Sequence, residues 1–161
     1  MDLKDLFVTL GGWIVALGTM IYTAIASRKD KQRQVDLADY ALIDDWLRRV
    51  DEAAFDYYQK ASENSAAWEK ATYDWESAKS RFNWVMGIVK SLDSPSPLYE
   101  YVEAHFKDLL AYENLAQRRH DPGNDEPEVI EKEHLQLQSQ VQTSSGNIYK
   151  ELRTRRKNIW K

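Results

Sequence analysis

Residues 6–26 read LFVTLGGWIVALGTMIYTAIA, and this stretch decides how the rest of the chain is interpreted. Its twenty-one residues include no Asp, Glu, Lys or Arg. A helix of about 20 residues rises about 30 Å, which is the thickness of the hydrocarbon core of a bilayer. The stretch therefore predicts a transmembrane helix within residues 1–27. A cleaved signal peptide is the competing interpretation, but it needs a basic start and a shorter apolar run.

The charges that flank this stretch predict its orientation. Four basic residues follow it within a few positions: Arg28, Lys29, Lys31 and Arg33. Lys and Arg close to the end of a span stay preferentially on the cytoplasmic side. We therefore expect a single-pass protein of an inner or plasma membrane with its N-terminus outside. Residues 28–36 would form a basic juxtamembrane linker, and residues 37–161 a cytoplasmic helical domain.

Small residues recur along the apolar stretch at steps of three and four. They are Thr9, Gly12, Ala16, Thr19, Thr23 and Ala26. Such a seam lets helices approach closely in a membrane, and threonine hydroxyls can bond across the contact. Because a single span has no second helix of its own to pack against, we expect a homo-oligomer.

The chain after the linker has the spacing of amphipathic helices. Apolar or small residues recur at steps of three and four in two series, interrupted at Asn64: Tyr40, Ile43, Leu47, Val50, Ala54, Tyr57 and Ala61, then Trp68, Ala71, Trp75, Ala78, Phe82, Val85, Val89 and Leu92. Two structures compete: one very long helix over residues 37–92, or a hairpin that turns at residues 62–65. We favour the hairpin, because the short polar side chains of Ser62-Glu63-Asn64-Ser65 suit a turn and a helix N-cap.

Two further helices are predicted beyond the prolines at 95 and 97. The first runs over about residues 97–118, with one face at Leu98, Val102, His105, Leu109, Tyr112 and Ala116. The second begins near Pro127, after a polar loop, with its stripe at Ile130, His134, Leu137, Val141, Ile148, Leu152 and Ile159. The polar stretch around Gly146 suggests a kink or a break in it. The fold class is therefore all-α, a bundle of three to four amphipathic helices behind the span.

Charge is unevenly distributed along a chain with a net charge of −4. Basic residues gather at the C-terminus: Arg153, Arg155, Arg156, Lys157 and Lys161. We interpret them as a site for membrane lipids or for an anionic small molecule such as a nucleotide. A solvated C-terminus with no ligand is the plainer alternative.

Catalytic and metal-binding patterns are missing. The chain has no cysteine, no glycine-rich phosphate loop and no HExxH pair. Glu131 and His134 have the ExxH spacing of di-iron bundles, but the second such motif is absent. His105 and His134 lie on apolar helix faces and are expected to pack in the core. We predict no enzymatic activity, no cofactor and no metal site.

Two functional hypotheses follow. In the first, a membrane-anchored homo-oligomer binds a protein partner or ligand on its cytoplasmic helices and couples this event to its membrane helices, as an adaptor or sensor. In the second, the protein is a signal-gated membrane effector, for example in bacterial antiviral defence. An anionic ligand bound by the cytoplasmic domain would then open a pore or perturb the bilayer.

Overall fold

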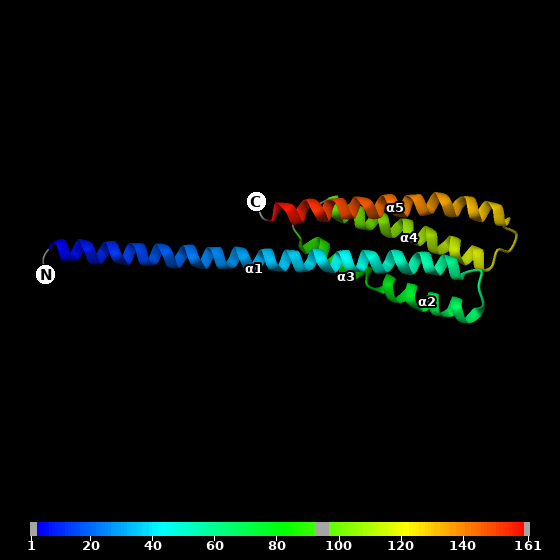
Figure 1. Ribbon diagram of the computed structural model, residues 1–161, viewed down its shortest axis with the longest axis horizontal. Helices are drawn as coiled ribbons and strands as arrows, with labels where there is room; N and C mark the ends of the chain where they lie inside the picture. Colours follow the sequence, from blue (N-terminus) through cyan, green and yellow to red (C-terminus); the bar gives the residue numbers. More distant parts are fainter. Residues whose placement is uncertain (1–2, 93–96, 160–161) are drawn as a thin grey trace. The chain divides into compact units, whose positions relative to one another are not determined.

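Helices make up most of the part of the chain that the structure describes. A computed structural model describes residues 3–92 and 97–159, with side chains from Leu17 onward. It contains the helices α1 Leu3–Lys60, α2 Ser65–Ser80, α3 Phe82–Ser91, α4 Pro97–His120 and α5 Pro127–Asn158 (Figure 1). No strand occurs within these ranges, so the predicted all-α class is confirmed.

The chain divides into two compact units. Unit 1 is Met1–Ala38, whose described residues belong to the first part of α1. Unit 2 is Asp39–Lys161, which comprises the rest of α1 and the helices α2 to α5. Only unit 2 contains buried core side chains among the described residues.

The hairpin between α1 and α2 is confirmed, and one helix over residues 37–92 is wrong. Asn64 caps α2, because its side-chain oxygen accepts a hydrogen bond from the backbone N–H of Ala67 at 3.0 Å. An Asn in this position supplies an acceptor to a first-turn N–H that has no partner within the helix. The two helices are antiparallel, with Tyr57 stacked on Trp68 at 4.2 Å between ring centroids.

A break at Arg81, between α2 and α3, was not predicted from the sequence. In a continuous helix the carbonyl of Ala78 would accept from the N–H of Phe82. Here it accepts from the indole N–H of Trp46 at 3.3 Å and from the N–H of Arg81 at 3.4 Å. A side chain that inserts into the hydrogen-bond ladder of a helix interrupts it, which explains the break at Arg81.

Helix α5 begins at Pro127, as predicted, but it runs unbroken past Gly146. The helix therefore has no break in this polar stretch. The hydroxyls of Thr143 and Ser144 donate to the carbonyls of Ser139 and Gln140, four residues earlier. These side chains thus bond within the helix and do not end it.

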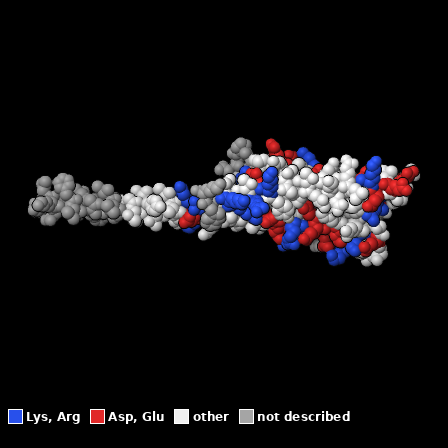
Figure 2. Space-filling view, turned by 45° about the horizontal axis from the view of Figure 1, so that its top comes forward, with Lys and Arg blue, Asp and Glu red and all other residues white. Residues whose placement is uncertain are grey.

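The predicted stripes form the core of unit 2. Every predicted position from Tyr40 to Ala61 is buried, and so are all six positions on α4. Trp68, Ala78 and Phe82 pack against the edge of the core instead. Positive and negative side chains are interspersed over the visible surface of unit 2 (Figure 2). The apolar stripes of these helices are therefore satisfied within the unit.

Candidate functional site at the basic end of the bundle

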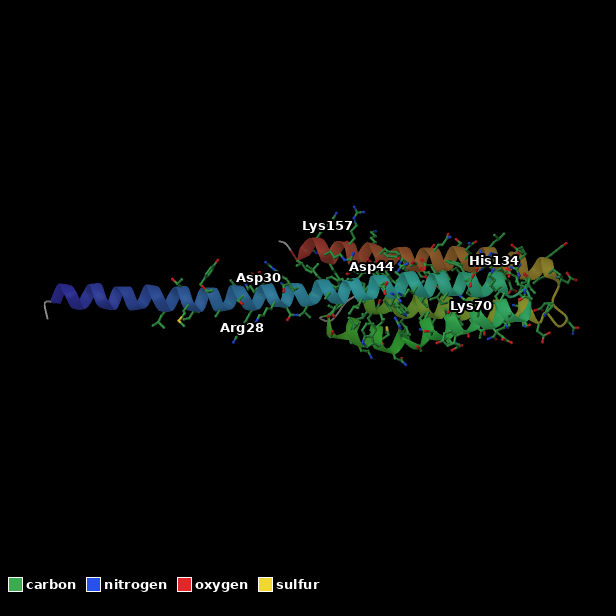
Figure 3. The ribbon with its side chains drawn as sticks, turned by 60° about the horizontal axis from the view of Figure 1, so that its bottom comes forward. Arg28, Asp30, Asp44, Lys70, His134 and Lys157 are labelled. Carbon is green, nitrogen blue, oxygen red and sulfur yellow. The ribbon has the colours of Figure 1, made fainter. Side chains whose placement is uncertain are left out.

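The C-terminal end of α5 lies beside the first turns of unit 2. Nη2 of Arg156 donates to the carbonyl of Tyr40 at 3.1 Å and to Oδ2 of Asp44 at 2.9 Å. In Figure 3, Lys157 lies on the last turns of α5 and Asp44 on the neighbouring stretch of α1. Arg156 thus links the end of α5 to two residues of α1 that precede it by 112 positions (Asp44) and by 116 positions (Tyr40).

Arg155 fixes the same end of α5 to α3. Its Nε donates to Glu151 at 2.8 Å within α5, and its Nη1 donates to the carbonyl of Leu92 at 3.3 Å. That carbonyl follows the last residue of α3, where the helix leaves carbonyls without an intrahelical partner. Arg155 therefore caps a neighbouring helix while remaining partly exposed.

The remaining cations at this end point to solvent. Arg153 and Lys157 are exposed and form no ion pair with any described residue. Lys90, in the last turn of α3, is exposed too, with Nζ 5.5 Å from the ring centroid of Tyr99. Lys161 lies outside the described residues. We call Lys90, Arg153, Arg155, Arg156 and Lys157 the basic end. Lys90 was not predicted from the sequence, because only the fold brings it close to the others.

The predicted juxtamembrane cations and part of the seam lie in unit 1. Arg33 pairs with Asp30 at 3.5 Å, whereas Arg28, Lys29 and Lys31 form no ion pair with a described residue. The side chains of the seam residues Thr9, Gly12 and Ala16 lie outside the described part. Farther along the seam, the hydroxyl of Thr23 donates to the carbonyl of Thr19 at 2.7 Å. Among the described residues, no helix has the length and hydropathy that crossing a membrane requires.

A buried polar cluster connects three helices at mid-bundle. His105 is fully buried, and its Nδ1 lies 2.9 Å from the hydroxyl of Ser144. Its Nε2 lies 2.9 Å from Oδ1 of Asp51, within ion-pair distance but not in hydrogen-bond geometry. Oδ2 of Asp51 accepts from the hydroxyl of Ser145 at 2.8 Å. The predicted burial of His105 is confirmed.

The cluster has the residue types of a hydrolytic triad, but its geometry does not suit hydrolysis. The hydroxyl of Ser144 also donates to the carbonyl of Gln140 within its own helix. The imidazole of His105 has no exposed surface, so a substrate carbonyl cannot reach it. A catalytic base must come within hydrogen-bond reach of the proton that it takes from a bound substrate. The cluster instead links α1, α4 and α5.

A second cluster, which we call the distal cluster, lies on the helix turns farthest from the basic end. It consists of Tyr58, Tyr112, Arg119, Glu131 and His134. The ring of Tyr58 stacks on His134 at 4.0 Å, and Arg119 lies 4.4 Å from the centroid of Tyr58 on a cation–π contact. Nδ1 of His134 lies 3.0 Å from the hydroxyl of Tyr112. Burial lowers the pKa of His134 and raises the pKa of Tyr112, so both side chains are held neutral.

The two residues of the ExxH pair, Glu131 and His134, both contact aromatic side chains. Oε2 of Glu131 accepts a hydrogen bond from the hydroxyl of Tyr58 at 3.4 Å, and His134 stacks on the ring of the same tyrosine. No group of three or more His, Asp or Glu side chains in the described part is arranged to hold a metal ion.

Comparisons of the chain with protein-family models, curated proteins and solved structures gave no significant match.

Proposed function

We propose that the chain is a homo-oligomeric membrane protein, anchored by residues 6–26, whose cytoplasmic bundle places its basic end against anionic lipid headgroups. As an adaptor or sensor, the bundle binds a partner on its helices and transmits this event to the membrane helices. The charge-free stretch supports the anchor, and the four basic residues after it support a cytoplasmic bundle.

The contact of Arg156 with the carbonyl of Tyr40 carries the proposal. Tyr40 follows Ala26 by fourteen residues, which span at most about 50 Å even when fully extended. The contact therefore tethers the basic end within a short chain length of the proposed anchor. Exposed Arg153 and Lys157 could each contribute about 1 kcal/mol close to an anionic leaflet.

A lipid surface fits the basic end better than a nucleotide does. Arg155 and Arg156 already donate to protein carbonyls and carboxylates. A nucleotide enclosed by this end would compete with those bonds for the same N–H groups. A headgroup layer needs only cations that project from the surface, such as Arg153 and Lys157.

The anchor is tested by extraction of membranes from cells that express the full chain. An integral protein stays in the pellet after alkaline carbonate treatment. We expect Leu17→Arg to shift the protein towards the supernatant, because a charge near the centre of a span costs about 2.5–3.5 kcal/mol. Leu42→Arg is the matched control, since Leu42 is an exposed leucine of unit 2. Full release of the unaltered protein would exclude the anchor.

The basic end is tested by hydrogen exchange at the last turns of α5. The full chain is placed in nanodiscs of phosphatidylserine and phosphatidylcholine, or of phosphatidylcholine alone. We expect slower exchange with the anionic lipid, and loss of this difference in the double variant Arg153→Gln, Lys157→Gln. Both substitutions leave the bonds of Arg155 and Arg156 untouched.

The matched control for that variant is Lys70→Gln with Lys132→Gln. Both lysines are exposed, and neither belongs to the basic end. Equal exchange in the two lipids would contradict a headgroup contact. Slower exchange in phosphatidylcholine discs on addition of ATP would point to a soluble anion instead.

A further inference from the structure

Helix α3 presents a face without acidic residues to the outside of unit 2. Its ten residues, Phe82–Ser91, contain no Asp or Glu. Val85, Met86 and Val89 are buried and point to the core. The exposed residues of the helix are Asn83, Trp84, Gly87, Lys90 and Ser91. We call these exposed residues the outer face of α3.

Trp84 differs from the other tryptophans that the structure describes in unit 2. It is 52% exposed, whereas Trp46 and Trp75 are buried and Trp68 packs against the core. Ile88, one turn further along α3, is half-buried on the same side of the helix. A tryptophan combines a large apolar ring with a polar N–H, so it suits a boundary between apolar and wet surroundings. Trp84 therefore offers such a contact at the surface of unit 2.

Exposed cations come before and after Trp84 along the chain. Arg81 precedes it by three residues, and Lys90 follows it by six, in the last turn of α3. Neither cation forms an ion pair with a described residue, although Lys90 lies over the ring of Tyr99. Six residues of helix rise about 9 Å, so Trp84 and Lys90 lie close together on one surface. Basic residues around a tryptophan are typical of helices that lie in a membrane–water interface.

Carboxylates on the neighbouring helices offset this positive charge only in part. Glu76 of α2 and Glu103 of α4 each form an ion pair with a lysine of their own helix. Glu100 of α4 is exposed and follows Tyr99, the residue over which Lys90 lies. It reduces the charge near the end of α3 but leaves Arg81 and the rest of the basic end. An anionic surface therefore fits this side of the bundle.

Helix α3 is continuous with the basic end. Nη1 of Arg155 donates to the carbonyl of Leu92, directly after α3, at 3.3 Å, and Lys90 is itself part of the basic end. A leaflet that touches the basic end therefore lies close to the outer face. We infer that the outer face of α3 lies in the headgroup layer of an anionic leaflet, with Trp84 at the boundary of the acyl chains. This inference rests on the proposed lipid contact of the basic end. The bundle then rests on the leaflet along the side of α3 and not on its end alone.

A lipid surface fits the outer face better than a protein partner does. Binding hot spots centred on a tryptophan are typically surrounded by packed residues that exclude water. Here Asn83, Gly87 and Ser91 are small or polar, and a Cβ atom added at Gly87 would meet no atom within 4 Å. The surface beside Trp84 is therefore open. Fluid lipid can close around a single ring between cations, whereas a protein would need a matching pocket.

The test uses the full chain with Gly87→Cys, which introduces the only thiol because the chain has no cysteine. Open space around this position lets the substitution keep the fold, and circular dichroism checks the helix content. The thiol carries a fluorophore, and the protein is placed in nanodiscs of phosphatidylserine and phosphatidylcholine that contain a nitroxide-labelled phosphatidylcholine. We expect the nitroxide to cause a loss of emission, because it quenches only at short range. The loss should be smaller in discs without phosphatidylserine.

Two changes should reduce this loss of emission. Trp84→Ala removes the apolar anchor, and the double variant Arg81→Gln, Lys90→Gln removes the cations next to it. The matched control is again Lys70→Gln with Lys132→Gln, which removes two exposed lysines that do not belong to α3. That control should leave the loss unchanged.

A label at Asn124→Cys measures the signal of a residue that does not touch lipid. Asn124 is exposed in the loop between α4 and α5, at the end of unit 2 opposite the C-terminal end of α5 (Figure 1). Quenching at residue 87 no stronger than at residue 124 would overturn the inference. Protection of the label at residue 87 from aqueous iodide without quenching by the nitroxide would overturn it too, and would indicate a protein contact such as a second copy.

Hydrogen exchange at the last turns of α5 separates this inference from the proposed function. Slower exchange there with anionic lipid, together with an unquenched label at residue 87, would overturn the contact of α3 alone. If neither the exchange nor the label responds to anionic lipid, the headgroup contact of the basic end fails as well.

Discussion

Two stretches of helix α1 contain similar apolar residues but bury them very differently. In unit 1, the apolar side chains between residues 17 and 25 are 51–75% exposed: Leu17, Met20, Ile21, Tyr22 and Ile25. In unit 2, those that begin the core are at most 5% exposed: Tyr40, Ile43, Leu47 and Val50. The apolar residues of the second stretch form one stripe, which other helices of unit 2 cover.

The largest effect expected from this difference is on stability. Leu47→Ala should lower the free energy of unfolding of the bundle by about 2–5 kcal/mol, because it opens a cavity among fully buried side chains. Leu17→Ala removes the same atoms from an exposed position and should leave that free energy unchanged. Denaturant unfolding of the full chain in detergent, followed by tryptophan fluorescence, measures both. Similar losses for the two variants would contradict the difference in burial.

The stripe, and with it most of the fold, could be predicted because helical spacing is a local property of the sequence. The hairpin was predictable for the same reason, since Asn64 acts on an N–H three residues away. The break at Arg81 was not, because its cause is the side chain of Trp46, 32 residues from Ala78. Nothing in the sequence near Arg81 indicates that a distant indole takes the carbonyl of Ala78.

The basic end shows the same limit. The cluster of cations was visible in the sequence, but the sequence does not indicate which of them bond to other parts of the protein. Arg156 donates to Asp44, 112 residues away, and Arg155 donates to the carbonyl of Leu92, 63 residues away. Only the fold shows that Arg153 and Lys157 remain exposed.

Polar side chains in the two stretches of α1 also differ in where their bonding partners lie. The hydroxyl of Thr23 bonds within its own helix, whereas Asp51 is bonded by Ser145 of α5 and lies against His105 of α4. Asp51→Ala should therefore cost about 1–3 kcal/mol of unfolding free energy, because it leaves buried polar groups without partners.

Thr23→Val is the matched control for Asp51→Ala and should leave the unfolding free energy of the bundle unchanged. The same denaturant measurement applies to both variants. A cost for Asp51→Ala no greater than that for Thr23→Val would show that the mid-bundle cluster does not hold the three helices together.

The smallest expected effect is a pH dependence confined to the bundle, because residues 1–38 contain no histidine. Burial lowers the pKa of His134, so the unfolded chain binds a proton more readily than the folded one. The contribution of a neutral His134 is fully present above its unfolded pKa of about 6.5. It is lost as the pH falls through the lower folded pKa. His134→Gln removes this proton uptake, so the unfolding free energy of the unaltered protein should fall more steeply below about pH 6.5 than that of the variant. Measuring both proteins across this range cancels the carboxylates they share, and parallel profiles would show that the ring of His134 titrates alike in both states.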